Sequence, residues 1–181
     1  MTATEIKFGG FGGQGVILAG MIIGRAASLY NDLFATLTQS FGPEARGSAC
    51  SCQVIVSKEK VLYPYVTKPE ILLVMSQEAC NKFLPYTTDD ATVIIEEDLV
   101  KPQGLKPGMK LFGIPATRLA EELGAKMTLN LVMVGFFTAV TKLVAYEAVR
   151  EAIIGAVPKG TEALNLKAFE RGHQYGVSLN Q

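Results

Sequence analysis

The stretch that decides the fold is "FGGFGGQGVILAG", residues 8–20, in which six of thirteen residues are glycine. Residues 5–9 have the pattern of a short strand, and apolar residues from Val16 to Tyr30 recur at helical spacing. The glycines between strand and helix match G-x-G-x-x-G, a turn whose bare backbone admits a phosphate at a helix N-terminus. The candidate binding residues here are Gly10, Gly12, Gly13, Gln14 and Gly15.

Strands and helices are expected to alternate along the rest of the chain. Further strands are predicted over residues 33–41, 51–57, 70–75, 91–97 and 110–114. Helices are predicted over residues 77–84 with Ser76 as N-cap, 115–124, 129–149, and from about 165 onward. A turn at 58–60 leads into "VLYP" (61–64), which is interpreted as a hairpin partner of the strand at 51–57.

This alternation predicts a Rossmann-like α/β fold, a three-layer α/β/α sandwich on a mixed, mostly parallel sheet. The hairpin supplies the antiparallel part. No Pro/Gly/Ser-rich linker divides the 181 residues, so one domain is expected over 1–181.

The composition excludes some partners and favours others. Seventeen basic residues balance seventeen acidic ones, so no nucleic-acid or anionic-membrane partner is expected. Only 19% of residues are charged, 49% are hydrophobic, and the mean hydropathy is +0.26. The helix expected at 129–149 is apolar on nearly every side through its first half, which requires cover all round. Part of the surface is therefore expected to face other chains.

The sequence also predicts the compartment. The N-terminus "MTATEIKF" has neither a basic region nor an apolar core of a secretory signal. The longest apolar run, residues 131–140, falls short of a membrane span. A cytoplasmic protein is expected.

Neither a metal site nor catalytic residues are assigned. Cys50, Cys52 and Cys80 form one C-x-C pair and one distant thiol, the wrong spacing for zinc or an iron–sulfur cluster. They are interpreted as reduced core cysteines. His173, the single histidine, is expected at the surface.

The glycine turn lacks one part of a dinucleotide site. An NAD site needs Asp or Glu at the end of the second strand, but this strand ends near Gln39, and Asp32 lies before it. Two interpretations stay open. One is a stand-alone nucleotide-binding α/β protein that uses Gly10–Gly15 as a phosphate loop. The other is a tight turn that brings bare backbone close to a ligand or a neighbouring subunit.

A second motif, "SFGPEARGSACSCQVIVS", occupies residues 40–57. Its loop presents Glu44 and Arg46 at the end of a strand, where α/β folds place ligands. Arg46 could hold a phosphate or carboxylate through two parallel hydrogen bonds. The alternative is a Glu44–Arg46 surface pair of little energetic value.

Together the two motifs resemble the gamma subunit of the 2-oxoacid:ferredoxin oxidoreductases. That family opens with G-G-x-G-G-Q-G-V-x-x-A-G, and this chain has "GGFGGQGV" at 9–16 followed by "AG" at 19–20. The family continues with S-Y/F-G-P-E-x-R-G-G, and this chain has "SFGPEARGS" at 40–48, with Ser48 in place of the second glycine. Further agreement comes from "MSQEACNKF" (75–83), "RLAEELG" (118–124), "LNLVMVGFF" (129–137) and "NLKAFERG" (165–172).

The resemblance implies a reaction and a division of labour. A 2-oxoacid and coenzyme A yield acyl-CoA and CO2, and two electrons pass to ferredoxin. Thiamine diphosphate with Mg²⁺ would belong to the alpha and beta subunits and the 4Fe-4S clusters to cluster-bearing partner subunits, with delta as a further partner. This chain would hold no cofactor tightly, would be inactive alone, and would complete the active site and help admit coenzyme A. By analogy within the family, 2-oxoglutarate is the preferred substrate of the complex. A third interpretation is a pure assembly module that binds no small molecule.

Overall fold

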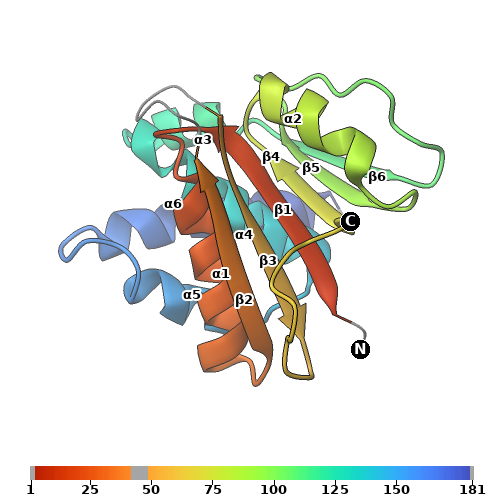
Figure 1. Ribbon diagram of the computed structural model, residues 1–181. Helices are drawn as coiled ribbons and strands as arrows, with labels where there is room; N and C mark the ends of the chain where they lie inside the picture. The colour runs from red at the N-terminus through yellow and green to blue at the C-terminus, as the bar shows by residue number, and fades with distance from the viewer. Residues whose placement is uncertain (1–2, 42–48, 180–181) are drawn as a thin grey trace.

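The structure, a computed structural model, describes residues 3–41 and 49–179 and is built on one six-stranded sheet (Figure 1). The strand order is β2-β3-β1-β4-β5-β6. The strands are β1 (Thr4–Phe11), β2 (Phe34–Phe41), β3 (Ala49–Ser57), β4 (Ile71–Val74), β5 (Thr92–Glu96) and β6 (Lys110–Ile114). All six were expected from the sequence, and β4 is the continuous apolar run of a strand buried on both faces.

The sheet is mixed, as predicted, but not because of the predicted hairpin. Strands β1, β4, β5 and β6 are parallel, whereas β3 runs antiparallel to both β1 and β2. The prediction of a strand at residues 61–64 was wrong, since they form no strand. Both edges of β3 are already paired, with β1 on one side and β2 on the other, so a further strand has no free edge to join.

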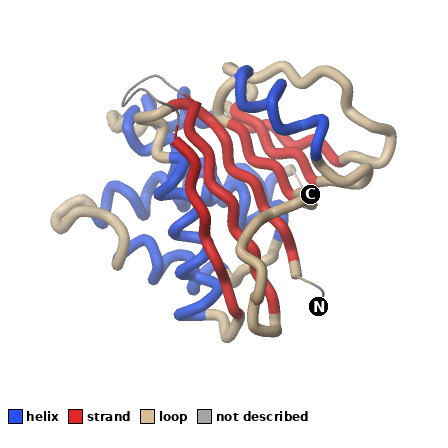
Figure 2. The backbone as a smooth tube through the Cα atoms, in the orientation of Figure 1, coloured by secondary structure: helices blue, strands red, loops and turns tan. Residues whose placement is uncertain are grey.

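Helices cover both faces of the sheet, which confirms the three-layer sandwich (Figure 2). One face carries α1 (Val16–Tyr30), α3 (Ala116–Glu122), α4 (Leu129–Thr141), α5 (Tyr146–Ile154) and α6 (Glu162–Ser178). The other carries α2 (Gln77–Phe83), followed by the 3₁₀ turn η1 (Leu84–Tyr86). Alternate residues of β4 show the division: Leu73 belongs to the core under α1 and α4, whereas Leu72 packs with α2. A second 3₁₀ turn, η2 (Lys126–Thr128), precedes α4.

The helix expected at 129–149 is two helices, so that prediction was wrong. Helix α4 ends at Thr141, and Lys142 takes a left-handed conformation with φ of 50°. The Thr141 hydroxyl donates to the Phe137 carbonyl at 2.9 Å and accepts the Leu143 N–H at 3.3 Å. The Leu143 N–H thus bonds to a side chain instead of to a helical carbonyl, and the helix does not continue. The final helix likewise begins earlier than expected, at Glu162.

Helices α4 and α6 pack backbone against backbone through glycines. An added Cβ at Gly172 would overlap the carbonyl group of Val132, and one at Gly135 would overlap that of Phe169. No larger residue fits at either position without separating the helices. The nearly all-apolar α4, with Asn130 through Ala139 buried, is thus covered within its own domain. The expectation that this helix needs cover all round is met by α6, α1, α3 and the sheet.

The α2 side of the sheet is only partly covered. Helix α2 contacts β1, β4 and the nearest part of β3, while no helix of the described chain lies over β2 on this side (Figure 1). The segment 58–70 crosses here instead, and its Val66 N–H donates to the Gln53 side chain of β3 at 3.0 Å. Exposed apolar side chains gather on this segment: Leu62 (86% exposed), Tyr63 (62%) and Tyr65 (57%).

None of the helices formed by residues 3–41 and 49–179 has both the length and the apolar character that crossing a membrane requires.

Candidate functional site

The glycine turn joins β1 to α1 as the sequence predicted. Strand β1 ends at Phe11, and α1 begins at Val16. Gly13 and Gly15 have φ of 99° and 73°, a region that residues with a Cβ rarely adopt, so both positions need glycine. Gly15 is the N-cap of α1, and no described side chain caps the helix or places a carboxylate in its first turn. The positive end of the α1 dipole therefore lies at this turn.

Gln14 fills the inside of the turn. Its Oε1 accepts the Phe11 N–H at 2.7 Å, and its Nε2 donates to the Met75 carbonyl at 2.9 Å. A Cβ at Gly10 would lie only 2.6 Å from that Oε1, so glycine at this position makes room for the Gln14 amide. The sequence predicted Gln14 as a binding residue; that its side chain also cross-links β1 and β4 was not foreseen, because Met75 lies 61 residues away.

Asn130 is a further residue of this turn that sequence reasoning missed. It is 2% exposed at the start of α4, and its Nδ2 donates to the Gly15 carbonyl at 3.4 Å. An added Cβ at Gly15 would overlap the Asn130 side chain. The one available signal was a polar residue at the front of the apolar run 131–140, where it indicates no more than the start of a helix.

The surroundings of the turn do not form a dinucleotide site. The parallel neighbour of β1 is β4, which is followed by Met75 and Ser76 rather than by a carboxylate. Ser76 caps α2, as predicted, by accepting the Ala79 N–H at 3.2 Å. Strand β2, the second in chain order, is separated from β1 by β3. The geometry thus removes the support for a conventional phosphate loop with an acidic ribose contact.

Glu44 and Arg46 lie outside the described residues, which end at Phe41 and resume at Ala49. The strand ends on either side of that segment are at the glycine edge of the sheet. Ala49 pairs with Phe11, and Cys50 pairs with both Gly10 and Phe41. The two sequence motifs are therefore joined through neighbouring strand ends.

The cysteines are free and buried. Burial raises the pKa of the Cys52 thiol to about 12, and its Sγ donates to the Val16 carbonyl at 3.5 Å, so it is an inert core residue. Among residues 3–41 and 49–179, no group of three or more His, Cys, Asp or Glu side chains could hold a metal ion. His173 is not at the surface as expected: it is half-buried, its ring centre 4.6 Å from that of Tyr146.

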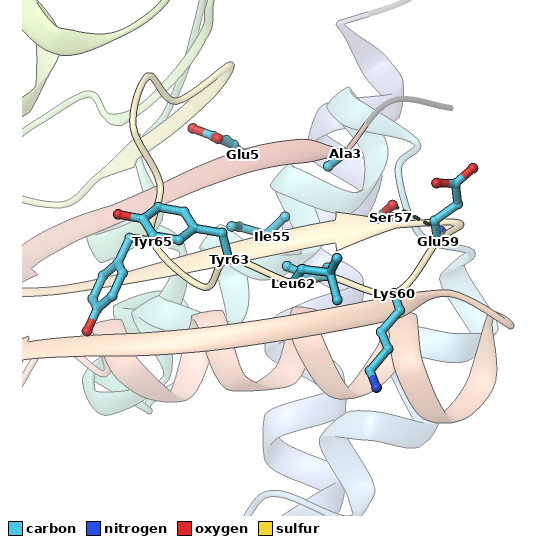
Figure 3. A pocket seen from close by; sticks show the side chains of 10 residues that line it. Ala3, Glu5, Ile55, Ser57, Glu59, Lys60, Leu62, Tyr63 and Tyr65 are labelled. Carbon is cyan, nitrogen blue, oxygen red and sulfur yellow. Dashed lines mark hydrogen bonds between the residues drawn. The ribbon is translucent and has the colours of Figure 1, made fainter.

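The partly covered sheet face holds a broad hollow of about 610 Å3 beside the start of β1 and the end of β3 (Figure 3). Tyr63, Tyr65 and Leu62 from segment 58–70 stand over Ile55 of β3 (Figure 3). At its edge the Glu5 carboxylate accepts the N–H groups of Thr67 and Lys68 at 2.8 and 2.9 Å. This hollow is an open, largely aromatic surface that Glu59 and Lys60 also line, which is typical of a contact surface.

Known proteins resemble this chain along its whole length. Residues 5–175 match the family model described as pyruvate ferredoxin/flavodoxin oxidoreductase. The chain is 44% identical to the 2-oxoglutarate synthase subunit KorC of Methanocaldococcus jannaschii, over 97% of this chain and 95% of that one. It is 31% identical to the pyruvate synthase subunit PorC of the same organism, over 92% and 93%.

Two solved structures share the fold. The gamma subunit of a keto/oxoacid ferredoxin oxidoreductase from Geobacter sulfurreducens is 33% identical, with a TM-score of 0.85 over 97% of this chain and 99% of that one. The 2-oxoglutarate:ferredoxin oxidoreductase of Magnetococcus marinus, solved with 2-oxoglutarate, coenzyme A and succinyl-CoA bound, is 21% identical with a TM-score of 0.85. It matches 98% of this chain but only 32% of its own. The glycine turn, the shared fold and the identity over nearly the whole chain agree with the predicted resemblance, and the chain belongs to the pyruvate ferredoxin/flavodoxin oxidoreductase family.

Proposed function

We propose that this chain is the gamma subunit of a 2-oxoacid:ferredoxin oxidoreductase complex that acts on 2-oxoglutarate. The observation that carries the proposal is the 44% identity to a 2-oxoglutarate synthase subunit over nearly both chains. The pyruvate synthase subunit of the same organism is only 31% identical, which favours 2-oxoglutarate over pyruvate. The reaction converts 2-oxoglutarate and coenzyme A to succinyl-CoA and CO2, and two electrons reduce ferredoxin.

The other subunits would hold the reacting groups. In this proposal thiamine diphosphate, Mg²⁺ and the 4Fe-4S clusters belong to the alpha, beta and delta subunits, ferredoxin docks through the assembled complex, and the complex works in the cytoplasm. Support comes from the Magnetococcus marinus enzyme, in which a domain with this fold makes up about a third of a longer chain. What that chain carries in one polypeptide would here be divided among subunits, and this chain would be inactive alone.

Within the complex, the glycine edge would face the other subunits. We assign Gly10, Gly12, Gly13, Gln14 and Gly15, with Glu44 and Arg46, to the surface that meets either a neighbouring subunit or the phosphates of coenzyme A. The uncapped N-terminus of α1 supports an anion here, because its backbone N–H groups and dipole favour negative charge.

Reconstitution tests the assignment of the complex and its substrate. The chain is co-expressed with the alpha, beta and delta subunits of its own organism, and the purified complex is assayed for dye reduction that depends on coenzyme A. Turnover with 2-oxoglutarate should exceed turnover with pyruvate or 2-oxoisovalerate by at least tenfold, and preparations lacking this chain should be inactive. Preference for another oxoacid would contradict the substrate, and a lone chain that binds and reduces NAD or FAD would contradict the subunit role.

Two variants separate the ligand role of the glycine edge from its contact role. If Arg46 binds a coenzyme A phosphate, Arg46→Ala should raise the KM for coenzyme A roughly tenfold or more with the complex intact. Arg150→Ala, which removes an exposed arginine paired with Glu151, is the control. If a neighbouring subunit packs on the turn, Gly12→Val should block assembly, whereas Gly155→Val at the exposed end of α5 should not.

A further inference from the structure

Lys7 is a buried lysine in the middle of β1. Only 7% of this residue is exposed, and a lysine is rarely buried so deeply unless its charge is paired. Its side chain lies on the α2 side of the sheet, where it lines a hollow of about 210 Å3 between α2 and the segment 66–69. Gln53, Thr67, Lys82, Phe83 and Tyr86 line the same hollow.

The Lys7 ammonium group has no anionic partner within the described chain. Its contact there is with the Phe83 ring, whose centre lies 4.4 Å from Nζ. The nearest carboxylate on the same strand face, Glu5, is bonded to the backbone of Thr67 and Lys68. An aromatic ring returns only part of the hydration that a buried ammonium group loses, so the charge is left undercompensated.

A second lysine increases the positive charge at this place. The Lys82 Nζ lies 5.5 Å from the centre of the same Phe83 ring. Burial lowers the pKa of Lys7, the nearby Cys52 opposes that shift, and the charge of Lys82 lowers it further. Two cations therefore share one aromatic ring, and the described chain supplies no carboxylate between them.

We propose that the hollow lined by Lys7 and Lys82 is a binding site for the phosphate group of a small molecule. A phosphate carries up to two negative charges and accepts hydrogen bonds from several directions, which matches two lysine ammonium groups better than a single carboxylate does. A volume of about 210 Å3 holds a phosphate head group rather than a whole cofactor, for which pockets of roughly 300–1,000 Å3 are usual. The exposed ring of Tyr86, at the same hollow, offers a flat apolar face to the rest of the molecule. This site is separate from the glycine edge and goes beyond the proposed function.

The test uses the purified full-length chain in phosphate-free buffer, with the additions compared at equal ionic strength. Thermal melting is followed while inorganic phosphate, phenyl phosphate or sodium chloride is added. Phosphate should raise the melting temperature saturably, by roughly 5 °C at saturation, and sodium chloride should not. A stronger response to phenyl phosphate would identify a phosphate ester with an aromatic part as the ligand class, and an equal response would identify free phosphate.

Lys7→Met supplies the discriminating result, because methionine keeps a long unbranched side chain and removes the charge. This variant should melt above the natural chain without phosphate and lose the response to phosphate. Lys110→Met, which removes an exposed strand lysine on β6, should respond as the natural chain does. An unchanged response in Lys7→Met overturns the proposal, as does a response that sodium chloride reproduces.

Lys82→Gln provides a second measurement that does not depend on a core substitution. It should weaken phosphate binding about fivefold or more by calorimetric titration, with the melting temperature of the free chain unchanged; unchanged binding overturns the proposal. Loss of complex assembly in Lys7→Met, with no phosphate response in the natural chain, would instead assign Lys7 to a carboxylate of a partner subunit. These readouts use the chain alone, so they are independent of whether the complex oxidises 2-oxoglutarate.

Discussion

The side-chain amide of Gln14 donates to the carbonyl oxygen of Met75 at 2.9 Å, and this bond ties the glycine turn to the end of β4. The same amide accepts the Phe11 N–H, so one side chain satisfies two backbone groups from strands that lie far apart in sequence. The turn is therefore braced from within by its own glutamine.

Replacing Gln14 should destabilise the fold and loosen the turn. Gln14→Ala leaves the Phe11 N–H and the Met75 carbonyl without partners and should lower the free energy of unfolding by about 1–3 kcal/mol. Gln14→Glu keeps the acceptor for the Phe11 N–H but loses the donor to the Met75 carbonyl. Its free energy of unfolding should lie between those of the natural chain and Gln14→Ala. Urea unfolding measures both variants; a loss below about 0.5 kcal/mol for Gln14→Ala would contradict the bracing role.

Two glycine-to-alanine changes in helices should have opposite effects on the free energy of unfolding. Gly172→Ala should destabilise the chain by about 3 kcal/mol or more, because the new methyl group overlaps the Val132 backbone and forces α4 and α6 apart. Gly24→Ala in α1 meets only Val54 Cγ1, at an ordinary 3.8 Å, and should stabilise by roughly 0.5–1 kcal/mol. Denaturant midpoints at equal m-value give the comparison, and two changes of the same sign would refute the packing argument.

Glu96 is a buried carboxylate that organises the end of β5. It is 0% exposed; its Oε2 accepts the Leu99 N–H at 2.8 Å, and its Oε1 accepts the Thr117 N–H at 3.2 Å. Burial raises the pKa of Glu96, and these hydrogen bonds oppose the shift. Glu96→Gln turns an NH2 group toward one of these donors and should cost about 1–3 kcal/mol. Glu97→Gln, which removes one oxygen of an exposed pair with Arg118, should cost under about 1 kcal/mol by the same measurement.

His173 should make the stability of the chain depend on pH below neutrality. Burial lowers the pKa of His173 below its ordinary value of 6.5, so the folded chain binds fewer protons than the unfolded chain in this range. Stability should fall as the pH drops through 6.5 toward the folded-state pKa, and the histidine should have no such effect well above neutral pH. His173→Phe keeps ring contacts with Tyr146 and Phe169 but cannot titrate.

Urea unfolding of both chains at about pH 5.5, 6.5 and 7.5 checks this prediction. The natural chain should lose more stability than His173→Phe between the highest and the lowest pH of the series. If the two chains differ in unfolding free energy by the same amount at every pH, the imidazole has the same pKa in the folded and the unfolded chain, and the prediction is wrong.

Sequence reasoning succeeded where the determining interactions are local. Helix α1 was predicted over its true bounds, Val16–Tyr30, because its apolar spacing and glycine-rich start lie in one short stretch. The cap at Ser76 was predicted in the same way, and so was the end of the helix at Gly124, which follows α3 with a left-handed φ. Each of these features depends on residues within one or two helical turns.

Most of what the sequence did not reveal concerns interactions between distant segments. Residues 61–64 have a strand-like composition, but whether they pair depends on β1 and β2 having already taken both edges of β3. The break between α4 and α5 is an exception: it depends on the local hydroxyl bonds of Thr141, which the apolar character of the surrounding residues hides. Lys7 was not singled out, because its place between apolar residues is that of a solvent-facing strand residue, yet α2, from some seventy residues later, lies beside it.

The central place of β1 in the sheet also determines when the N-terminal segment can fold during synthesis. Its two neighbours end at Ser57 and Val74, so no nascent chain shorter than that can pair it on both sides. Until Met75 has left the ribosome, Gln14 has no acceptor, and Ile6 and Phe8 lack the neighbours that bury them. A segment made before both of its partners thus acquires its final form late, and the growing chain displays apolar residues to chaperones throughout that interval.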